Sequence, residues 1–152
     1  MSRKLLFVFN PHSGKGQIKN NLVDIVDIMV KAGYEVTIYT TQARADATRK
    51  VIEEAQNFDR IVCSGGDGTL DEVVTGLIQS EASTPIGYIP AGSTNDFANS
   101  LGIPKEMVKA AEVAVGNNPF PCDIGDFNSD TFVYVAAFGL FTEVSYKTSQ
   151  QL

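Results

Sequence analysis

The chain has 152 residues, of which 43% are hydrophobic and 20% are charged, and this profile predicts one soluble globular domain with a real core. Its net charge of −6 argues against a broad basic surface for nucleic acid. Two distant cysteines, Cys63 and Cys122, and a single histidine argue against a disulfide framework or a zinc site. We therefore expect a reducing, cytoplasmic setting, since the apolar run at residues 5–9 is too short for a signal peptide.

The first part of the chain predicts strand, loop and helix in that order. Residues 4–9 form a continuous apolar run typical of a parallel strand covered on both faces, and residues 10–16 break it. Apolar residues then recur at helical spacing until Gly33, which is placed to end the helix. Residues 34–39 alternate as a second strand, and Asp46 is predicted to cap the next helix. That helix is predicted to pack through Val51, Ile52 and Ala55.

A glycine-rich loop at residues 65–69, Gly-Gly-Asp-Gly-Thr, is the most informative stretch. It joins an apolar strand at residues 60–64 to a strong helical stripe that begins at Leu70. Glycines let a backbone come close to a ligand, and the N-terminus of the following helix favours phosphate. Asp67 inside such a loop predicts a cation between carboxylate and phosphate, as in a magnesium-bound nucleotide.

Glu72 has a second interpretation. Thr69 and Glu72 have the spacing of a capping box, in which each side chain satisfies the backbone N–H of the other residue. This would make Glu72 structural, and the sequence leaves open whether it also has a functional role.

The second part of the chain continues the alternation of strands and helices. Residues 86–89 are predicted to form a strand, and a turn is predicted directly after it at residues 90–96. A short helix is expected to end at Leu101, and another is expected from Pro104 to about Val115 with Gly116 just beyond it. Two further strands are predicted at residues 123–126 and 132–138.

Repeated strand and helix units predict an α/β fold with a three-layer parallel sheet and helices on both faces, similar to a Rossmann fold. Ligand sites in such folds lie at the carboxyl ends of the strands, where all three glycine-bearing loops are expected. Asn95 and Asp96 in the third loop either cap the helix ahead of Phe97 or face a ligand.

Three loop motifs follow one another along the chain: Asn10-Pro11-x-Ser13-Gly14-Lys15, Gly65-Gly66-Asp67-Gly68-Thr69 with Asp71-Glu72-Val73, and Gly92-Ser93-Thr94-Asn95-Asp96-Phe97. Their combination closely resembles the catalytic domain of the diacylglycerol kinase family, above all the bacterial soluble lipid kinases. The resemblance extends from Lys4 to Tyr146. A lone GGDGT motif would also suit an NAD kinase, so the joint occurrence of the motifs carries the resemblance.

The resemblance implies an ATP-dependent kinase that transfers the γ-phosphoryl group to a lipid hydroxyl, most simply that of diacylglycerol, to give phosphatidic acid. The fold would be the nucleotide-binding domain of the NAD-kinase and diacylglycerol-kinase type over residues 1–152, and a C-terminal β-sandwich domain with the catalytic base would lie beyond it. The chain alone is then expected to be inactive. The implied partners are ATP, Mg²⁺, a lipid acceptor at a membrane surface and a second subunit in a homodimer.

By position, the resemblance implies a nucleotide site made of three loops and one strand end: Asn10, Pro11, His12, Ser13, Gly14, Lys15, Thr41, Gly65, Gly66, Asp67, Gly68, Thr69, Leu70, Asp71 and Ser93. Asp67 would be the catalytic and metal-binding residue. Lys15 is either a point charge for phosphate or a solvated side chain at a helix start. Asp71 and Tyr134 depart from the family pattern, in which asparagine is usual at both positions.

Two other functions remain open. An NAD kinase shares the GGDGT loop, although the loop at residues 10–11 and the motif at residues 92–97 favour the lipid kinase. A nucleotide-binding module without catalysis of its own is the other alternative. The acceptor lipid is also open, because sphingoid bases, phosphatidylglycerol and polyprenols carry a suitable hydroxyl.

Overall fold

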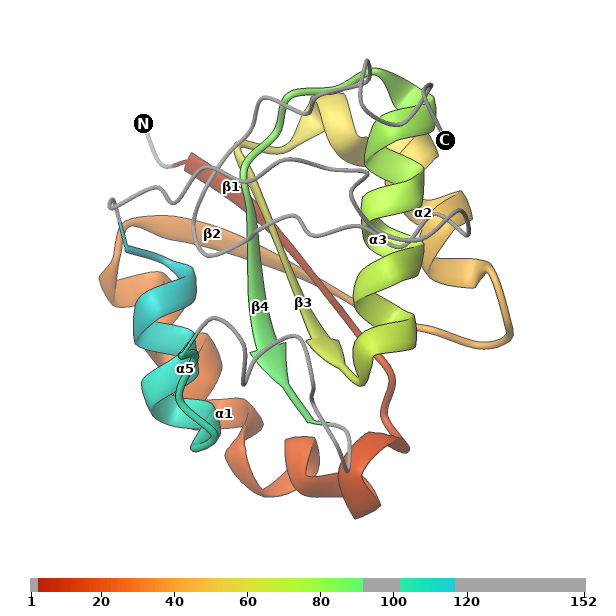
Figure 1. Ribbon diagram of the computed structural model, residues 1–152. Coiled ribbons are helices and arrows are strands. Elements are labelled where there is room, and N and C mark those ends of the chain that lie inside the picture. The colour runs from red at the N-terminus through yellow and green to blue at the C-terminus, as the bar shows by residue number, and fades with distance from the viewer. Residues whose placement is uncertain (1–2, 92–101, 117–152) are drawn as a thin grey trace.

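A computed structural model describes residues 3–91 and 102–116, which form a sheet between two layers of helices (Figure 1). The four strands are all parallel and lie in the order β2-β1-β3-β4. Their bounds are Arg3–Phe9 (β1), Tyr34–Thr40 (β2), Arg60–Gly65 (β3) and Ile86–Pro90 (β4). The predicted α/β fold with a parallel sheet is confirmed.

The helices cover both faces of this sheet. Helices α1 (Gln17–Lys31) and α5 (Met107–Ala114) pack together on one face, whereas α2 (Asp46–Glu54) and α3 (Asp67–Ser80) pack together on the other (Figure 1). Short 3-10 turns precede α1 at Ser13–Gly16 and follow α2 at Ala55–Asn57.

The central strands explain the apolar runs in the sequence. Every residue of β3 and the last five residues of β1 are buried, because each strand has a neighbour on either side and helices above and below. Phe9 lies opposite Thr40 and Ser64, and Gly65 lies opposite Pro90. The carboxyl ends of all four strands therefore meet at one edge of the sheet, which brings their loops together.

The predicted helical stripes face the core. Leu70, Val73, Val74 and Leu77 of α3 are each at most 2% exposed, and burial of such a side chain stabilises the fold by about 1.5–3 kcal/mol. Gly33 follows α1 with φ +99°, as a residue that ends a helix in the left-handed region. The stripe predicted for α2 is confirmed at Val51 and at Ala55, which directly follows the helix, but it is wrong at Ile52, which is 43% exposed; α2 also buries Ala47.

Two predicted helix starts are also wrong. Helix α5 begins at Met107 and not at Pro104, because Glu106 has extended backbone (φ −75°, ψ 125°) and interrupts the helical path. Helix α2 begins at Asp46, but its N-cap is Ala45, and no side chain caps it locally. The elements predicted for residues 92–101 and from residue 117 onward lie outside the described residues.

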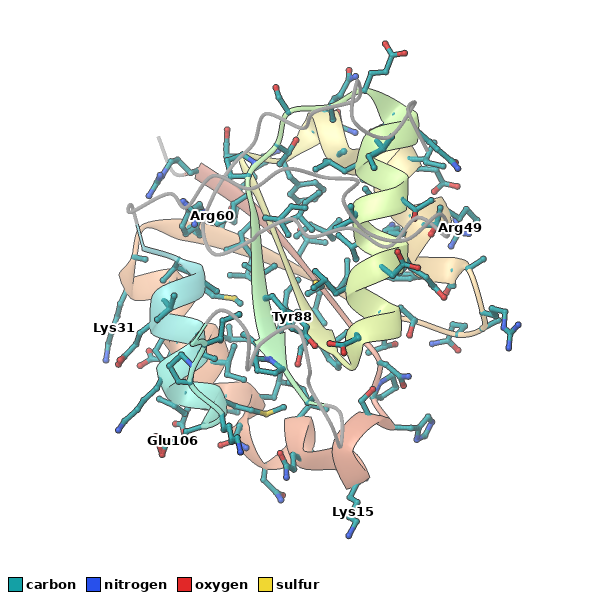
Figure 2. The ribbon with its side chains drawn as sticks, viewed as in Figure 1. Lys15, Lys31, Arg49, Arg60, Tyr88 and Glu106 are labelled. Atoms are coloured by element: carbon teal, nitrogen blue, oxygen red, sulfur yellow. The ribbon has the colours of Figure 1, made fainter. Side chains whose placement is uncertain are left out.

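Arg60 ties the opposite, amino-terminal edge of the sheet to α5 (Figure 2). Its side chain is 6% exposed, and Nη1 donates to the carbonyl oxygens of Ala114 at 2.7 Å and Gly116 at 3.1 Å. A cation suits these carbonyls because the end of a helix leaves them without intrahelical donors and carries negative partial charge. Arg60 thus has a structural role at this edge.

Candidate functional site

A cavity of about 440 Å³ opens at the carboxyl edge of the sheet. The loops after β1, β2 and β3 converge there and provide its walls: Asn10, His12, Thr41, Gln42, Ala43, Arg44, Gly68, Thr69 and Glu72. This position agrees with the expectation that ligands of parallel α/β sheets bind beyond the carboxyl ends of the strands.

The loop after β1 forms one wall by an unusual backbone path. The side-chain oxygen Oδ1 of Asn10 accepts the N–H of His12 at 2.9 Å, which makes a tight turn directly after the strand. Three consecutive residues then have left-handed backbone, with φ of +58° at Gly14, +62° at Lys15 and +75° at Gly16. A Cβ at Gly14 would overlap the carbonyl oxygen of Ala91, at the end of β4. The loop after β1 is therefore packed closely against the end of β4.

The glycine-rich loop forms the base of the site and passes directly into α3. The helix begins at Asp67, three residues before the predicted start at Leu70, because the N–H groups of Thr69 and Leu70 already donate to the carbonyl of Gly66. Gly68 in this first turn lines the cavity, and a Cβ there would meet no atom within 4 Å. A ligand can therefore approach the bare backbone at the positive end of the helix, an arrangement that favours anions.

Glu72 does not take part in the predicted capping box. Its carboxylate oxygens accept the N–H of Ala45 at 3.0 Å and of Ala47 at 3.3 Å, and both of these donors lie at the start of α2. Thr69 cannot be the N-cap because it already lies inside α3. Glu72 lies about one turn after Thr69 in the same helix, and its side chain faces α2. A carboxylate at a helix N-terminus is favourable for the dipole and for the free N–H groups. Glu72 thus joins α2 to α3 across the cavity wall.

Asp46 holds the loop after β2. Its carboxylate accepts the N–H of Gln42 at 2.7 Å and the hydroxyl of Tyr39 at 2.8 Å, and it pairs with Arg49 at 2.8 Å. These contacts hold the pKa of Asp46 below its ordinary value; the hydrogen bond from the Gln42 N–H has the largest effect, followed by those from Tyr39 and Arg49. The predicted role as helix cap is wrong, because the carboxylate points back to the loop that lines the cavity.

Two buried groups lie beneath the glycine-rich loop. Cys63 is fully buried in β3, and burial raises the pKa of its thiol to about 12. Tyr88 of β4 is 1% exposed, and its hydroxyl donates to the carbonyl of Gly65 at 2.9 Å. Burial raises the pKa of Tyr88, and the neighbouring Cys63 and Asp67 act in the same direction.

Not all residues of the predicted site reach the cavity. Its walls contain Asn10, His12, Thr41, Gly68 and Thr69 from that set, while Pro11, Ser13, Gly14, Gly65, Gly66, Asp67 and Asp71 belong to the same loops or first turns without lining it. Lys15 is exposed and points away from the cavity (Figure 2). Leu70 is fully buried in the core, and Ser93 lies outside the described residues.

Four lining residues were not predicted: Gln42, Ala43, Arg44 and Glu72. For Glu72, the capping-box spacing left a functional role open. The other three lie in the loop after β2. The expected parallel sheet could have predicted them, since every loop at the carboxyl edge of such a sheet is a candidate wall of a ligand site.

The described residues contain no group of three or more His, Cys, Asp or Glu side chains that could hold a metal ion by themselves. In the same part of the chain, every helix is too short or too polar to cross a bilayer.

Residues 4–127 match the protein family described as the diacylglycerol kinase catalytic domain. The chain is 39% identical over 155 residues to a diacylglycerol kinase of Staphylococcus carnosus (strain TM300), covering 100% of this chain and 50% of that protein. It is 38% identical over 152 residues to a diacylglycerol kinase of Bacillus subtilis (strain 168), covering 99% and 50% respectively. The chain therefore spans about half the length of these curated relatives.

A solved structure of a diacylglycerol kinase also matches this chain. The crystal structure of a diacylglycerol kinase from Bacillus anthracis str. Sterne matches with a TM-score of 0.71 and 34% sequence identity, over 78% of this chain and 44% of that one.

Proposed function

Since this chain belongs to the diacylglycerol kinase catalytic-domain family, we propose that it is the ATP-binding part of a lipid kinase. The kinase transfers the γ-phosphoryl group of ATP to the hydroxyl of diacylglycerol and yields phosphatidic acid. The observation that carries this proposal is the cavity at the carboxyl edge, where the bare backbone of Gly68 and the N-terminus of α3 meet the loop after β1.

The walls of the cavity suggest how ATP lies in it. The phosphates sit against the first turn of α3 and the turn at Asn10, where backbone N–H groups and the helix dipole favour negative charge. The nucleoside extends toward the loop after β2, at Thr41 and Gln42. The cavity volume of about 440 Å³ falls within the usual range for small-molecule sites, roughly 300–1,000 Å³.

Magnesium fits this arrangement through Asp67. The ion commonly takes one or two protein carboxylates and completes its shell with phosphate oxygens and water, so a cluster of three acidic side chains is not needed. Asp67 stands in the first turn of α3, next to the proposed phosphate position. The bound ion would neutralise phosphate charge during transfer. The acceptor lipid requires access to a membrane surface, so we further propose a cytoplasmic protein that associates with membranes peripherally.

The test uses the full-length protein that contains this chain, with vesicles of phosphatidylglycerol and diacylglycerol and radiolabelled ATP. Asp67→Asn should reduce phosphatidic acid formation about 100-fold or more, because charge neutralisation at the phosphates is lost. Asp59→Asn is the matched control, since Asp59 accepts the N–H of Lys4 at the opposite edge of the sheet. Equal activity of both variants would disprove the role of Asp67. Transfer to NAD but not to diacylglycerol would disprove the lipid kinase.

A further inference from the structure

Tyr88 places one hydroxyl group in the core below the site. The side chain is 1% exposed and lies toward the carboxyl edge of the sheet, beside the start of α3 (Figure 2). A phenylalanine would fill almost the same volume without a polar group to satisfy, and a buried hydroxyl needs a partner. One partner here is the carbonyl oxygen of Gly65, at 2.9 Å, and the side chain of Asp67 is a second hydrogen-bonding neighbour. The contact therefore acts on the residue that lies two positions before α3, whose first turn is the proposed phosphate site.

The carbonyl of Gly65 accepts two hydrogen bonds, both from β4 and its end. Besides the Tyr88 hydroxyl, the N–H of Ala91 donates to it at 2.9 Å. A carbonyl has two lone pairs, so the pair of donors saturates it and holds it toward β4. The peptide bond between Gly65 and Gly66 is flanked by glycine on both sides and has no side chain of its own to fix its orientation.

The direction of the Gly65 carbonyl determines the direction of the Gly66 N–H. In a planar trans peptide the two groups point to opposite sides. Ser64, the preceding residue, already turns its carbonyl toward β1, where it accepts the N–H of Asn10 at 3.2 Å. The N–H of Gly66 is therefore directed away from β4, toward the side of the sheet on which β1 lies.

We propose that Tyr88 is a positioning residue for the nucleotide, whose hydroxyl holds the Gly65–Gly66 peptide so that the Gly66 N–H is presented to a phosphate oxygen. This inference rests on the proposed function, since it requires phosphate at the glycine-rich loop. A tyrosine hydroxyl is protonated at neutral pH, so it can donate to the Gly65 carbonyl.

The experiment measures binding of ATP with magnesium, and of adenosine, to the full-length protein by titration calorimetry. Tyr88→Phe should weaken ATP binding about fivefold to tenfold, the size expected for one oriented hydrogen bond. Adenosine binding should not change, because adenosine has no phosphate to meet the Gly66 N–H. Tyr34→Phe is the matched control: Tyr34 is also buried, but it lies at the amino-terminal edge beside Arg3 and Arg60.

Equal weakening for ATP and adenosine, or a lower melting temperature with unchanged ATP affinity, would show that Tyr88 only stabilises the fold. If Tyr88→Phe does not fold, the amide signal of Gly66 in the wild-type NMR spectrum decides: it should move strongly downfield when ATP is added, and an unchanged signal would overturn the proposal. A wild type that binds ATP but does not phosphorylate diacylglycerol would refute the proposed function alone, whereas one that binds no ATP would refute both.

Discussion

The two side walls of the cavity are built by different physical means. The loop after β1 is shaped by backbone conformation, with three successive left-handed residues at Gly14, Lys15 and Gly16. The opposite wall, formed by the loop after β2 and the start of α2, is held by carboxylates that accept backbone N–H groups. Glu72 reaches Ala45 and Ala47, and Asp46 reaches Gln42.

This difference determines how each wall responds to change. A wall that depends on φ and on steric contact should be sensitive to the size of a side chain and insensitive to pH. A wall held by carboxylates should tolerate changes of size but respond to loss of charge and to acid. Substitutions in either wall of the full-length protein should therefore have different consequences.

Gly14→Ala should have the largest effect. The new Cβ would overlap the backbone of Ala91, which cannot move aside like the end of a flexible side chain, and φ of +58° is unfavourable for alanine as well. We expect a loss of more than about 2 kcal/mol in the free energy of unfolding, and loss of ATP binding. Urea denaturation and calorimetric titration measure the two effects.

Gly16→Ala separates conformation from contact, because φ is +75° but no atom lies within 4 Å of the added Cβ. It should reduce the free energy of unfolding by only about 1 kcal/mol. Equal losses for the two variants would mean that the contact with Ala91 does not matter.

Glu72→Ala should have the next largest effect. The N–H groups of Ala45 and Ala47 lose their acceptor, which for a helix N-terminus reduces the free energy of unfolding by about 1–2 kcal/mol. The loop after β2 loses its attachment to α3, so the KM for ATP should rise more than kcat falls.

Glu53→Ala on α2, the helix whose N-terminal N–H groups Glu72 accepts, is the control, since Glu53 is 49% exposed and its carboxylate pairs with Arg49 on the same helix. Its stability and its KM should both remain close to those of the wild type. An unchanged KM in Glu72→Ala would contradict the role of Glu72 in the cavity wall.

Asp46→Asn should have a smaller effect that depends on pH. The pKa of Asp46 is lowered from 3.8 in the folded protein, so the stability that its charge contributes is complete above that value and is lost as pH falls through the lower, folded-state pKa. The difference in free energy of unfolding between wild type and variant should therefore be constant from pH 7 to 5 and shrink below about pH 4. Urea denaturation at each pH gives this difference, and a difference that does not shrink in acid would exclude the ionic contribution.

Lys15→Gly should have the smallest effect. The side chain is exposed and points away from the cavity, so ATP affinity should change less than about twofold after screening by salt. Stability should rise by up to about 1 kcal/mol, because glycine accepts the φ of +62° without strain. Thermal unfolding and ATP titration test the two statements. A large loss of ATP affinity would restore Lys15 to the phosphate site.

Sequence periodicity predicted those strands and helices whose formation depends on residues close together in the chain. The apolar run before Asn10 became β1, and the stripe from Leu70 to Leu77 became the buried face of α3, because the period of 3.6 residues and the run of apolar residues are visible along the chain itself. The passage from strand to helix at the glycine-rich stretch was predicted for the same reason, but its bounds were wrong: Gly65 ends β3 and Gly68 lies in α3, so only Gly66 separates the two elements.

The sequence could not decide which donors the carboxylates meet, since Glu72 bonds to residues 27 and 25 positions away, whereas Asp46 bonds back to a loop residue four positions before it. Glu72 has the spacing of a local cap, yet it contacts Ala45 and Ala47 because α3 starts three residues early and packs on α2. Asp46 stands at a helix start, yet it holds Gln42. Both Asp46 and Glu72 carry a strong local signal for a helix cap. Which backbone N–H each carboxylate reaches was determined only by the packing of α2 against α3 and by the order of the strands.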